Sequence, residues 1–259
     1  MQPSNPATGF NYLLRGFSLI RRKELRSYVI IPLLINMIIF SVMLWLGIGL
    51  YEGLMNQYLP DEGLPMWLPD WTWLEILLTP LRWMAWMLFA LAFMLIFFYG
   101  FTLVANLIAA PFNDRLSAKV EELLTGERPQ ESESGSLLST ATSSVMQEIN
   151  KLGWFASRAI PLLLLFFIPG VNLVAPLLWG VFSAYSLAYE YLDYPMCNHG
   201  IAFRHQRSFH RKQRLATTGF GGGVMLIMAI PFVNFAAMPI AVCGASAWWA
   251  ERLKNRYEG

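Results

Sequence analysis

Four long apolar segments without charged residues dominate the chain. They cover residues 27–51, 83–113, 159–189 and 215–250, and polar stretches separate them. A helix needs about 20 mainly apolar residues to cross a bilayer, and each segment is longer than that. The first two segments therefore predict helices that span a membrane. Hydrophobic residues make up 56% of the chain, above the roughly 45–50% of soluble domains, as expected for an integral membrane protein.

The third and fourth segments carry the same break near the middle. Both read Ile-Pro-x-Val-Asn, at 168–172 and 230–234, and a second proline follows each. A proline inside a helix removes a hydrogen bond and clashes with the preceding turn. The halves, about 10–19 residues each, are short for an upright crossing. We therefore expect two re-entrant hairpins that penetrate the membrane partially, or two pairs of short tilted crossings. Matching broken segments indicate a substrate site in transporters.

The polar stretches complete an all-helical fold. Apolar residues recur at helical spacing in 1–26, which predicts an amphipathic lead-in helix on the membrane surface. Helical periodicity in 114–158 predicts a cytoplasmic extension of the membrane helices, and the chain has no strand pattern. We therefore expect 1–259 to form a single all-α membrane domain. Gly219 and 221–223 begin the last apolar segment, where they indicate close helix packing or a flexible entry equally.

Lysine and arginine set the expected orientation. Of 19 such residues, only Arg82 lies in 52–82. The others lie in 1–26, 114–158, 190–214 and 251–259. Positive charge stays on the cytoplasmic side of a membrane. Both termini are therefore expected inside and 52–82 outside. The third and fourth apolar segments have cytoplasmic-type charge at both ends, so each must return to the side from which it enters.

The polar residues form no recognisable catalytic pattern. No nucleophile, base and orienting group occur together, and no spacing of Cys, His, Asp or Glu is typical of a metal site. The glycines at 221–223 are not followed by the Lys-Ser/Thr of a phosphate-binding loop. We therefore expect no enzymatic activity, no catalytic residue, no metal or other cofactor, and no nucleic-acid partner.

A basic run at 204–214 stands out among the polar stretches. It holds five of the cationic side chains, and all three histidines fall between 199 and 210. Such a patch attracts anionic lipid or an anionic substrate. The alternative is a charge cluster that only sets the topology.

Several polar residues fall at membrane depth or at its edge. Arg26 lies where the surface helix would turn into the first membrane helix. An arginine beside free helix N–H groups is a strong donor for an oxyanion; the alternative is an interfacial arginine that snorkels. Buried amides need partners, so they line a polar path or join helices. The candidates for the lining of a pore are Asn36, Asn106, Asn113, Arg158, Asn172 and Asn234.

Several blocks of the chain resemble the CysZ-type sulfate permease family, from about Gly9 to Trp249. The blocks include Leu25-Arg26 with Val29-Ile30-Ile31-Pro32, Ala105-Asn106-Leu107-Ile108-Ala109-Ala110-Pro111-Phe112-Asn113, Asp193-Tyr194-Pro195 and Ile230-Pro231-Phe232-Val233-Asn234-Phe235. The resemblance implies a bacterial inner-membrane protein that brings sulfate, and also the similar oxyanion sulfite, into the cytoplasm for cysteine biosynthesis. It also implies two long spanning helices, two partially penetrating hairpins, contact with membrane lipid, and a homo-oligomer, either a dimer or a trimer of dimers.

The resemblance also implies a sulfate-binding motif at the start of the first membrane helix. The family has Gly-Leu-Arg there, often followed by a second arginine. The corresponding residues in this chain are Glu24, Leu25, Arg26 and Ser27. Arg26 matches the family pattern. Glu24 takes the place of the glycine, and its carboxylate would repel a dianion. Ser27 offers a hydroxyl in place of the second arginine.

Two other classes of function compete with transport. A non-transporting scaffold would use its hairpins to bend the bilayer or to recruit a partner, and it predicts no ion flux from purified protein. A lipid-modifying membrane enzyme would use Asp193 and His199, and it predicts loss of activity on Asp193→Asn with folding intact.

Overall fold

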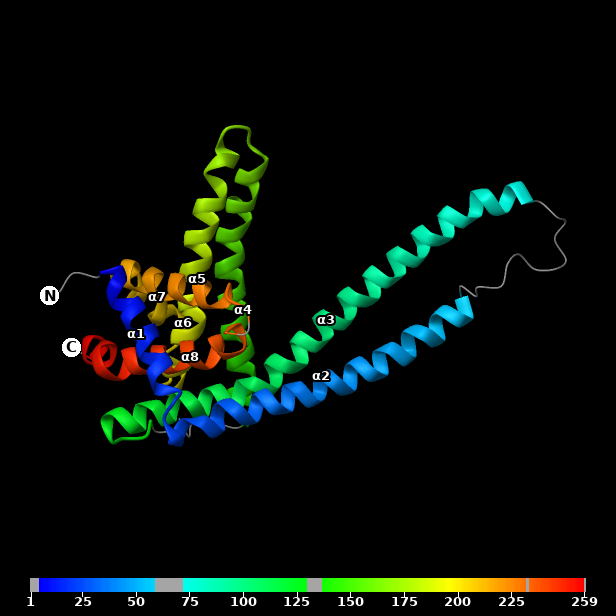
Figure 1. The fold of residues 1–259 in the computed structure, drawn as a ribbon. Coiled ribbons are helices and arrows are strands. Elements are labelled where there is room, and N and C mark those ends of the chain that lie inside the picture. Colours follow the sequence, from blue (N-terminus) through cyan, green and yellow to red (C-terminus); the bar gives the residue numbers. More distant parts are fainter. Residues whose placement is uncertain (1–4, 59–71, 130–136, 232, 259) are drawn as a thin grey trace. The chain divides into compact units, whose positions relative to one another are not determined.

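The computed structural model describes residues 5–58, 72–129, 137–231 and 233–258. All regular elements in these ranges are helical, which confirms the all-α prediction for the described part of the chain (Figure 1). Parts of the predicted outer loop (59–71) and of the predicted extension (130–136) lie outside the described residues. The helices are α1 (Pro6–Leu19), α2 (Lys23–Tyr58), α3 (Thr72–Thr125), α4 (Leu137–Leu164), α5 (Ala175–Asn198), α6 (Phe203–Lys212), α7 (Arg214–Met228), α8 (Asn234–Trp248) and α9 (Lys254–Glu258), with short turns η1 (Leu165–Phe167), η2 (Val171–Leu173) and η3 (Trp249–Leu253).

Internal contacts divide the chain into two compact units, 31–110 and 1–30 with 111–259. Helices α2 and α3 each run from one unit into the other. In the smaller unit these helices meet through aromatic rings, with 4.9 Å between the ring centroids of Phe40 and Phe101. Large apolar side chains also point outward, since Trp45 and Ile96 are each 74% exposed. Such a surface requires apolar surroundings.

Within the described residues, three stretches are long and apolar enough to cross a membrane. Lys23–Leu54 contains the predicted 27–51 span, and Trp86–Thr125 overlaps the predicted 83–113 span. The third stretch, Ile149–Phe167, covers most of α4 together with η1. The apolar pattern therefore located both long helices correctly, while α4 adds a candidate crossing within the first predicted hairpin.

The two predicted breaks are present and share two backbone hydrogen bonds. Each asparagine N–H donates to the isoleucine carbonyl four residues earlier, at 3.0 Å for Asn172 and 3.1 Å for Asn234. A second bond joins each valine carbonyl to the N–H three residues later, at 3.0 Å in the first break and 2.9 Å in the second. Gly170 in the first break has φ 83°, which favours glycine. The repeated sequence is therefore a repeated turn between two helices.

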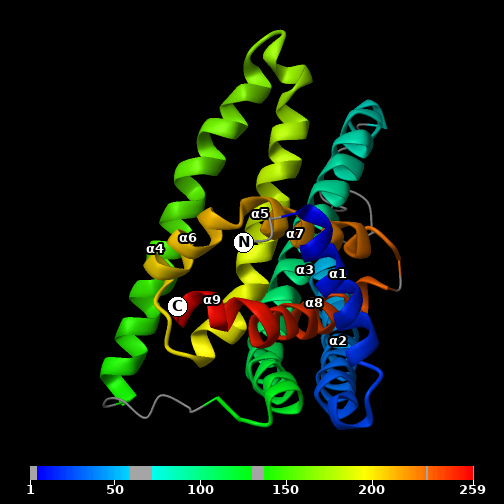
Figure 2. The same ribbon diagram turned by 90° about the vertical axis from the view of Figure 1, so that its left-hand side faces the viewer.

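The two hairpins differ in length and surroundings. The second has two arms of 15 residues, α7 and α8, within the predicted half-lengths. The arms of the first are longer, with 28 residues in α4 and 24 in α5. The predicted half-lengths count only the apolar residues 159–189. Helix α4 begins earlier, within the predicted helical extension 114–158, and α5 continues to Asn198, past the end of the apolar segment. Figures 1 and 2 show α4 and α5 projecting together beyond α7 and α8.

The core of the larger unit forms where α1, α5, α7 and α8 pack together (Figure 2). Helix α1 buries Gly9, Leu13, Gly16 and Leu19. A Cβ at Gly9 would collide with the carbonyl oxygen of Ala216 in α7, and one at Gly16 with that of Ile240 in α8. Backbones approach this closely only where a residue lacks a side chain. The predicted lead-in helix therefore exists and packs against both arms of the second hairpin.

Candidate anion-binding site

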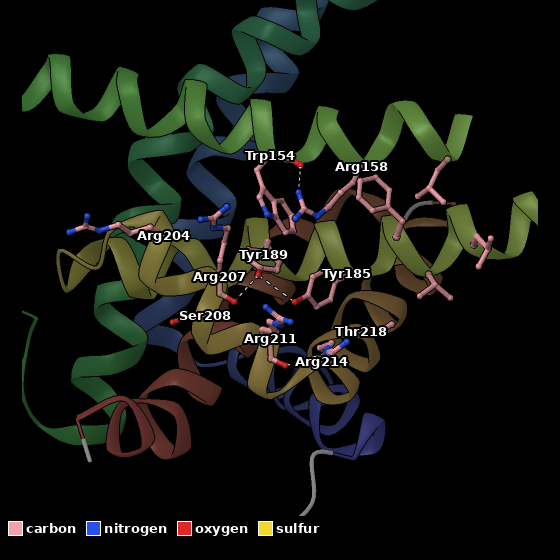
Figure 3. Close-up of a pocket in the computed structure, with 14 residues that line it drawn as sticks. Trp154, Arg158, Tyr185, Tyr189, Arg204, Arg207, Ser208, Arg211, Arg214 and Thr218 are labelled. Atoms are coloured by element: carbon pink, nitrogen blue, oxygen red, sulfur yellow. Dashed lines mark hydrogen bonds between the residues drawn. The ribbon is translucent and has the colours of Figure 1, made fainter. Parts of the chain in front are cut away.

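A cleft of about 790 Å³ in the larger unit is lined by α4, α5, α6 and the start of α7 (Figure 3). Its cationic lining residues are Arg158 from α4, Arg204, Arg207 and Arg211 from α6, and Arg214 from α7. Hydroxyl groups of Tyr185, Tyr189, Ser208 and Thr218 also line it, and no carboxylate is among the lining residues. We refer to it as the arginine cleft. Five positive charges and no lining acid suit an anion.

The local sequence explains how α6 presents its charges. Arg204, Arg207 and Arg211 are spaced by three and four residues, so they share one face of a helix. The opposite face of α6 is buried through Phe203, Gln206, Phe209 and His210. Because this buried face packs inward, the arginine face is directed to the cleft.

The guanidinium groups of the cleft make few bonds within the protein. The Arg158 guanidinium stacks on the Trp154 ring, 4.0 Å from its centroid, and donates to the Trp154 carbonyl at 2.9 Å. The Arg207 guanidinium lies 5.8 Å from the centroid of the Phe203 ring. No carboxylate of the described residues forms an ion pair with any of the five arginines. Their charge is therefore available to an anion.

The cleft has an apolar end as well as a charged one. Its apolar lining residues are Leu162, Leu178, Val181 and Phe182. All four lie nearer the tip of the α4–α5 hairpin than Arg158 and Tyr185, because α4 runs towards the tip and α5 away from it. The charged end therefore lies near the base of the hairpin.

His210 belongs to the core and not to the predicted basic patch. Its side chain is 1% exposed, and its ring centroid lies 4.3 Å from that of Tyr189. Burial lowers the pKa of His210 to about 3, and the opposing effect of the Asp193 charge is smaller. Of the other two histidines, His205 is exposed, whereas the His199 Nε2 lies 2.8 Å from the Glu121 carboxylate. The permanent charge of the patch therefore comes from its four arginines, Arg204, Arg207, Arg211 and Arg214, together with Lys212.

We expect His210 to make the protein less stable in acid. The unfolded side chain binds a proton near pH 6.5, whereas the folded one binds it only near pH 3. Between these values the unfolded state holds more protons, so stability falls as the pH falls, by up to about 1.4 kcal/mol per pH unit. Melting temperatures from about pH 7 to about pH 4 should show a smaller slope for His210→Phe than for the parent. The exposed His205→Phe is the matched control and should keep the parent slope; equal slopes in all three proteins would contradict the assignment.

The predicted motif Glu24, Leu25, Arg26 and Ser27 forms the first turn of α2. Leu25 is fully buried and anchors this turn in the core. The other three residues are exposed. The Arg26 Nε donates to the Arg21 carbonyl at 3.0 Å, which orients the side chain beside the start of the helix. None of the four residues lines the arginine cleft.

The six predicted pore-lining residues do not form one group. Arg158 lies in the arginine cleft, whereas Asn36 and Asn106 lie in the smaller unit. Asn113 is buried and its Nδ2 donates to the Met238 Sδ at 3.2 Å, so it joins α3 to α8. Asn172 and Asn234 are exposed at the two breaks. Only Arg158 among them contributes to the cleft.

Asp193 and His199, the two residues of the enzyme hypothesis, contact different side chains. Asp193 accepts from the Lys151 ammonium at 2.9 Å and from the Gln206 amide at 2.7 Å. Burial would raise the pKa of Asp193, but the Lys151 charge and the hydrogen bonds from Cys197, Lys151 and Gln206 hold it below its usual range. His199 pairs instead with Glu121, which also lies 3.5 Å from the Lys254 ammonium. These contacts join helices of the larger unit.

The helical fold and its three long apolar stretches define a membrane protein. Residues 12–239 match the sequence profile of the family described as Sulfate transporter CysZ/Etoposide-induced protein 2.4, so the chain belongs to that family. It is a sulfate transporter-like membrane protein, and the resemblance found in the sequence blocks is confirmed.

Proposed function

We propose that this protein carries sulfate, and also sulfite, into the cytoplasm across the bacterial inner membrane, where the sulfur supplies cysteine biosynthesis. The observation that carries the proposal is the family match over 12–239. An exposed arginine in the first turn of α2, Arg26, agrees with an oxyanion as the substrate. Transport is the whole activity in this proposal, with no chemical step, metal or cofactor.

The proposed topology has both termini in the cytoplasm, with the stretches 114–158 and 190–214 on the same side. Its support is the distribution of lysine and arginine, of which only Arg82 lies in 52–82. In this arrangement α2 and α3 span the bilayer, while the α4–α5 and α7–α8 hairpins enter and return. The apolar surfaces of α2 and α3 in the smaller unit would face lipid or another copy in a homo-oligomer.

Sulfate would bind at the Arg26 guanidinium and the first turn of α2, at the cytoplasmic end of that helix. A helix N-terminus favours anions, and an arginine adds a charge-assisted donor. The exposed asparagines at the two breaks, Asn172 and Asn234, would offer amide groups on the path between the hairpins.

Uptake of labelled sulfate into liposomes that contain the purified full-length protein tests the proposal. Flux should exceed that of empty liposomes, and excess sulfite should reduce it whereas excess chloride should not. A well-folded protein without sulfate flux would overturn the proposal and favour the scaffold. Conversion of lipid by the same liposomes, lost in Asp193→Asn, would favour the enzyme.

A further inference from the structure

We propose that the arginine cleft binds the phosphate headgroup of an anionic phospholipid, whose acyl chains lie against the apolar surface of the α4–α5 hairpin. This inference goes beyond sulfate transport. It requires only that the chain is a membrane protein, and it concerns a site separate from the first turn of α2.

The first argument is charge. Five arginines line the cleft, none of them paired with a carboxylate of the described residues, and hydroxyls of Ser208 and Thr218 lie among them. Arginine matches the geometry of phosphate oxygens through its planar fork of donors. Basic pockets between membrane helices bind phospholipid headgroups in this way. Figure 3 shows Arg158, Arg207, Arg211 and Arg214 around Tyr185 and Tyr189, whereas Arg204 extends away from the two rings.

The second argument is the apolar end, which a small inorganic anion would not need. From Tyr189 near the arginines to Leu178 near the tip, α5 rises by about 16 Å. One leaflet of the hydrocarbon core is about 15 Å thick. An amphiphile with its phosphate among the arginines would therefore extend its chains along Leu178 and Val181 towards the tip of the hairpin.

The third argument is continuity with an exposed apolar surface. Val181 and Leu178 are 51% and 41% exposed, and the surface continues to Leu177 at 68% and Leu173 at 83%. Acyl chains that leave the cleft would thus stay on apolar protein surface. The amphipathic cleft matches a phospholipid in both charge and length.

Native mass spectrometry of the detergent-solubilised full-length protein tests the proposal. The probes are phosphatidylglycerol and phosphatidylcholine with the same acyl chains. The parent should retain phosphatidylglycerol in preference. The double variant Arg207→Gln with Arg211→Gln should weaken that binding by about thirtyfold. Each arginine near a lipid headgroup contributes about fivefold to the binding constant, and the two factors multiply. Lys212→Gln with Arg115→Gln removes the same charge outside the cleft and should leave binding unchanged.

Two further probes separate a lipid from a free oxyanion. Leu178→Ser with Val181→Ser should weaken phosphatidylglycerol binding and leave binding of glycerol phosphate, the headgroup without chains, unchanged. Equal retention of phosphatidylglycerol by the cleft variant and the control would overturn the proposal. So would inorganic sulfate or glycerol phosphate that binds as tightly as the lipid and is lost with the arginines, a result that would assign the cleft to a free oxyanion.

Discussion

Replacing Arg26 with alanine should reduce sulfate flux by about ten- to a hundredfold at sulfate concentrations below saturation. A hydrogen bond to a charged group contributes about 1.5–3 kcal/mol, and each 1.4 kcal/mol is about tenfold in binding. The Arg26 Nε is bound to the Arg21 carbonyl at 3.0 Å, which leaves the two terminal nitrogens to meet two sulfate oxygens. The measurement is initial uptake of labelled sulfate into liposomes with matched protein content.

Three further variants define what Arg26 does. Arg21→Ala removes the same charge from an adjacent position, where the guanidinium lies 4.6 Å from the Phe17 ring centroid, and it should retain most of the flux. Arg26→Lys should fall between alanine and the parent, because lysine keeps the charge and loses the fork. Glu24→Gln should raise the flux at low sulfate, since it removes a carboxylate near the dianion. Unchanged flux in Arg26→Ala would move the site away from α2.

Gly221→Ala should destabilise the protein strongly, whereas Gly222→Ala should be neutral or stabilising. A Cβ at Gly221 would collide with the Ala184 carbonyl oxygen of α5, which is backbone and has no other rotamer. Forcing α5 and α7 apart should cost about 2–3 kcal/mol. Gly222 has no atom within 4 Å of the same added group, and alanine in a helix gains about 0.5–1 kcal/mol over glycine.

The two substitutions are chemically identical and adjacent, so each is the control of the other. Their melting temperatures in detergent should differ by roughly 6–12 °C, because their free energies of unfolding should differ by about 3 kcal/mol. Equal melting temperatures, or a more stable Gly221→Ala, would contradict close packing of α5 on α7. Elution as a single sharp peak on size exclusion would verify that each variant is folded before melting.

The sequence predicted the features that local chemistry dictates. The prolines of the third and fourth apolar segments predicted both breaks. The start of the apolar run 27–51 predicted that Arg26 lies in the first turn of the first long helix. The glycines at 221–223 left close packing and flexible entry equally open, and the structure shows close packing at two of them within the continuous helix α7. Gly221 and Gly223 face close neighbours, whereas Gly222 faces open space, because adjacent helical residues point about 100° apart.

The arginine cleft could be predicted only in part. The spacing of Arg204, Arg207 and Arg211 already indicates one charged helix face, and that signal was available. Their meeting with Arg158 depends on the fold of α5 back along α4, which no local pattern contains. His210 was wrongly predicted to belong to the exposed basic patch, for a related reason. It lies on the same short helix as the arginines, and only the packing of α6 on Tyr189 directs it inward.

The first hairpin shows why the end of an apolar run does not predict the end of a helix. Segment 159–189 ends where charged residues begin, yet α4 starts at Leu137 and α5 continues to Asn198. A helix can pass from lipid into water without interruption, because its backbone hydrogen bonds are internal in both.

The arginine cleft has two walls that are held very differently. Arg204, Arg207 and Arg211 lie on α6, whose buried face packs into the core of the larger unit. In that core, Gly221 lets α7 approach α5 closely. Arg158 lies on α4. This helix contacts α5 through the Trp154 and Phe155 rings, which both lie against Tyr189, and through the Lys151–Asp193 ion pair. A ligand that contacts both walls would therefore join α4 to α6 through the cleft, in addition to these contacts.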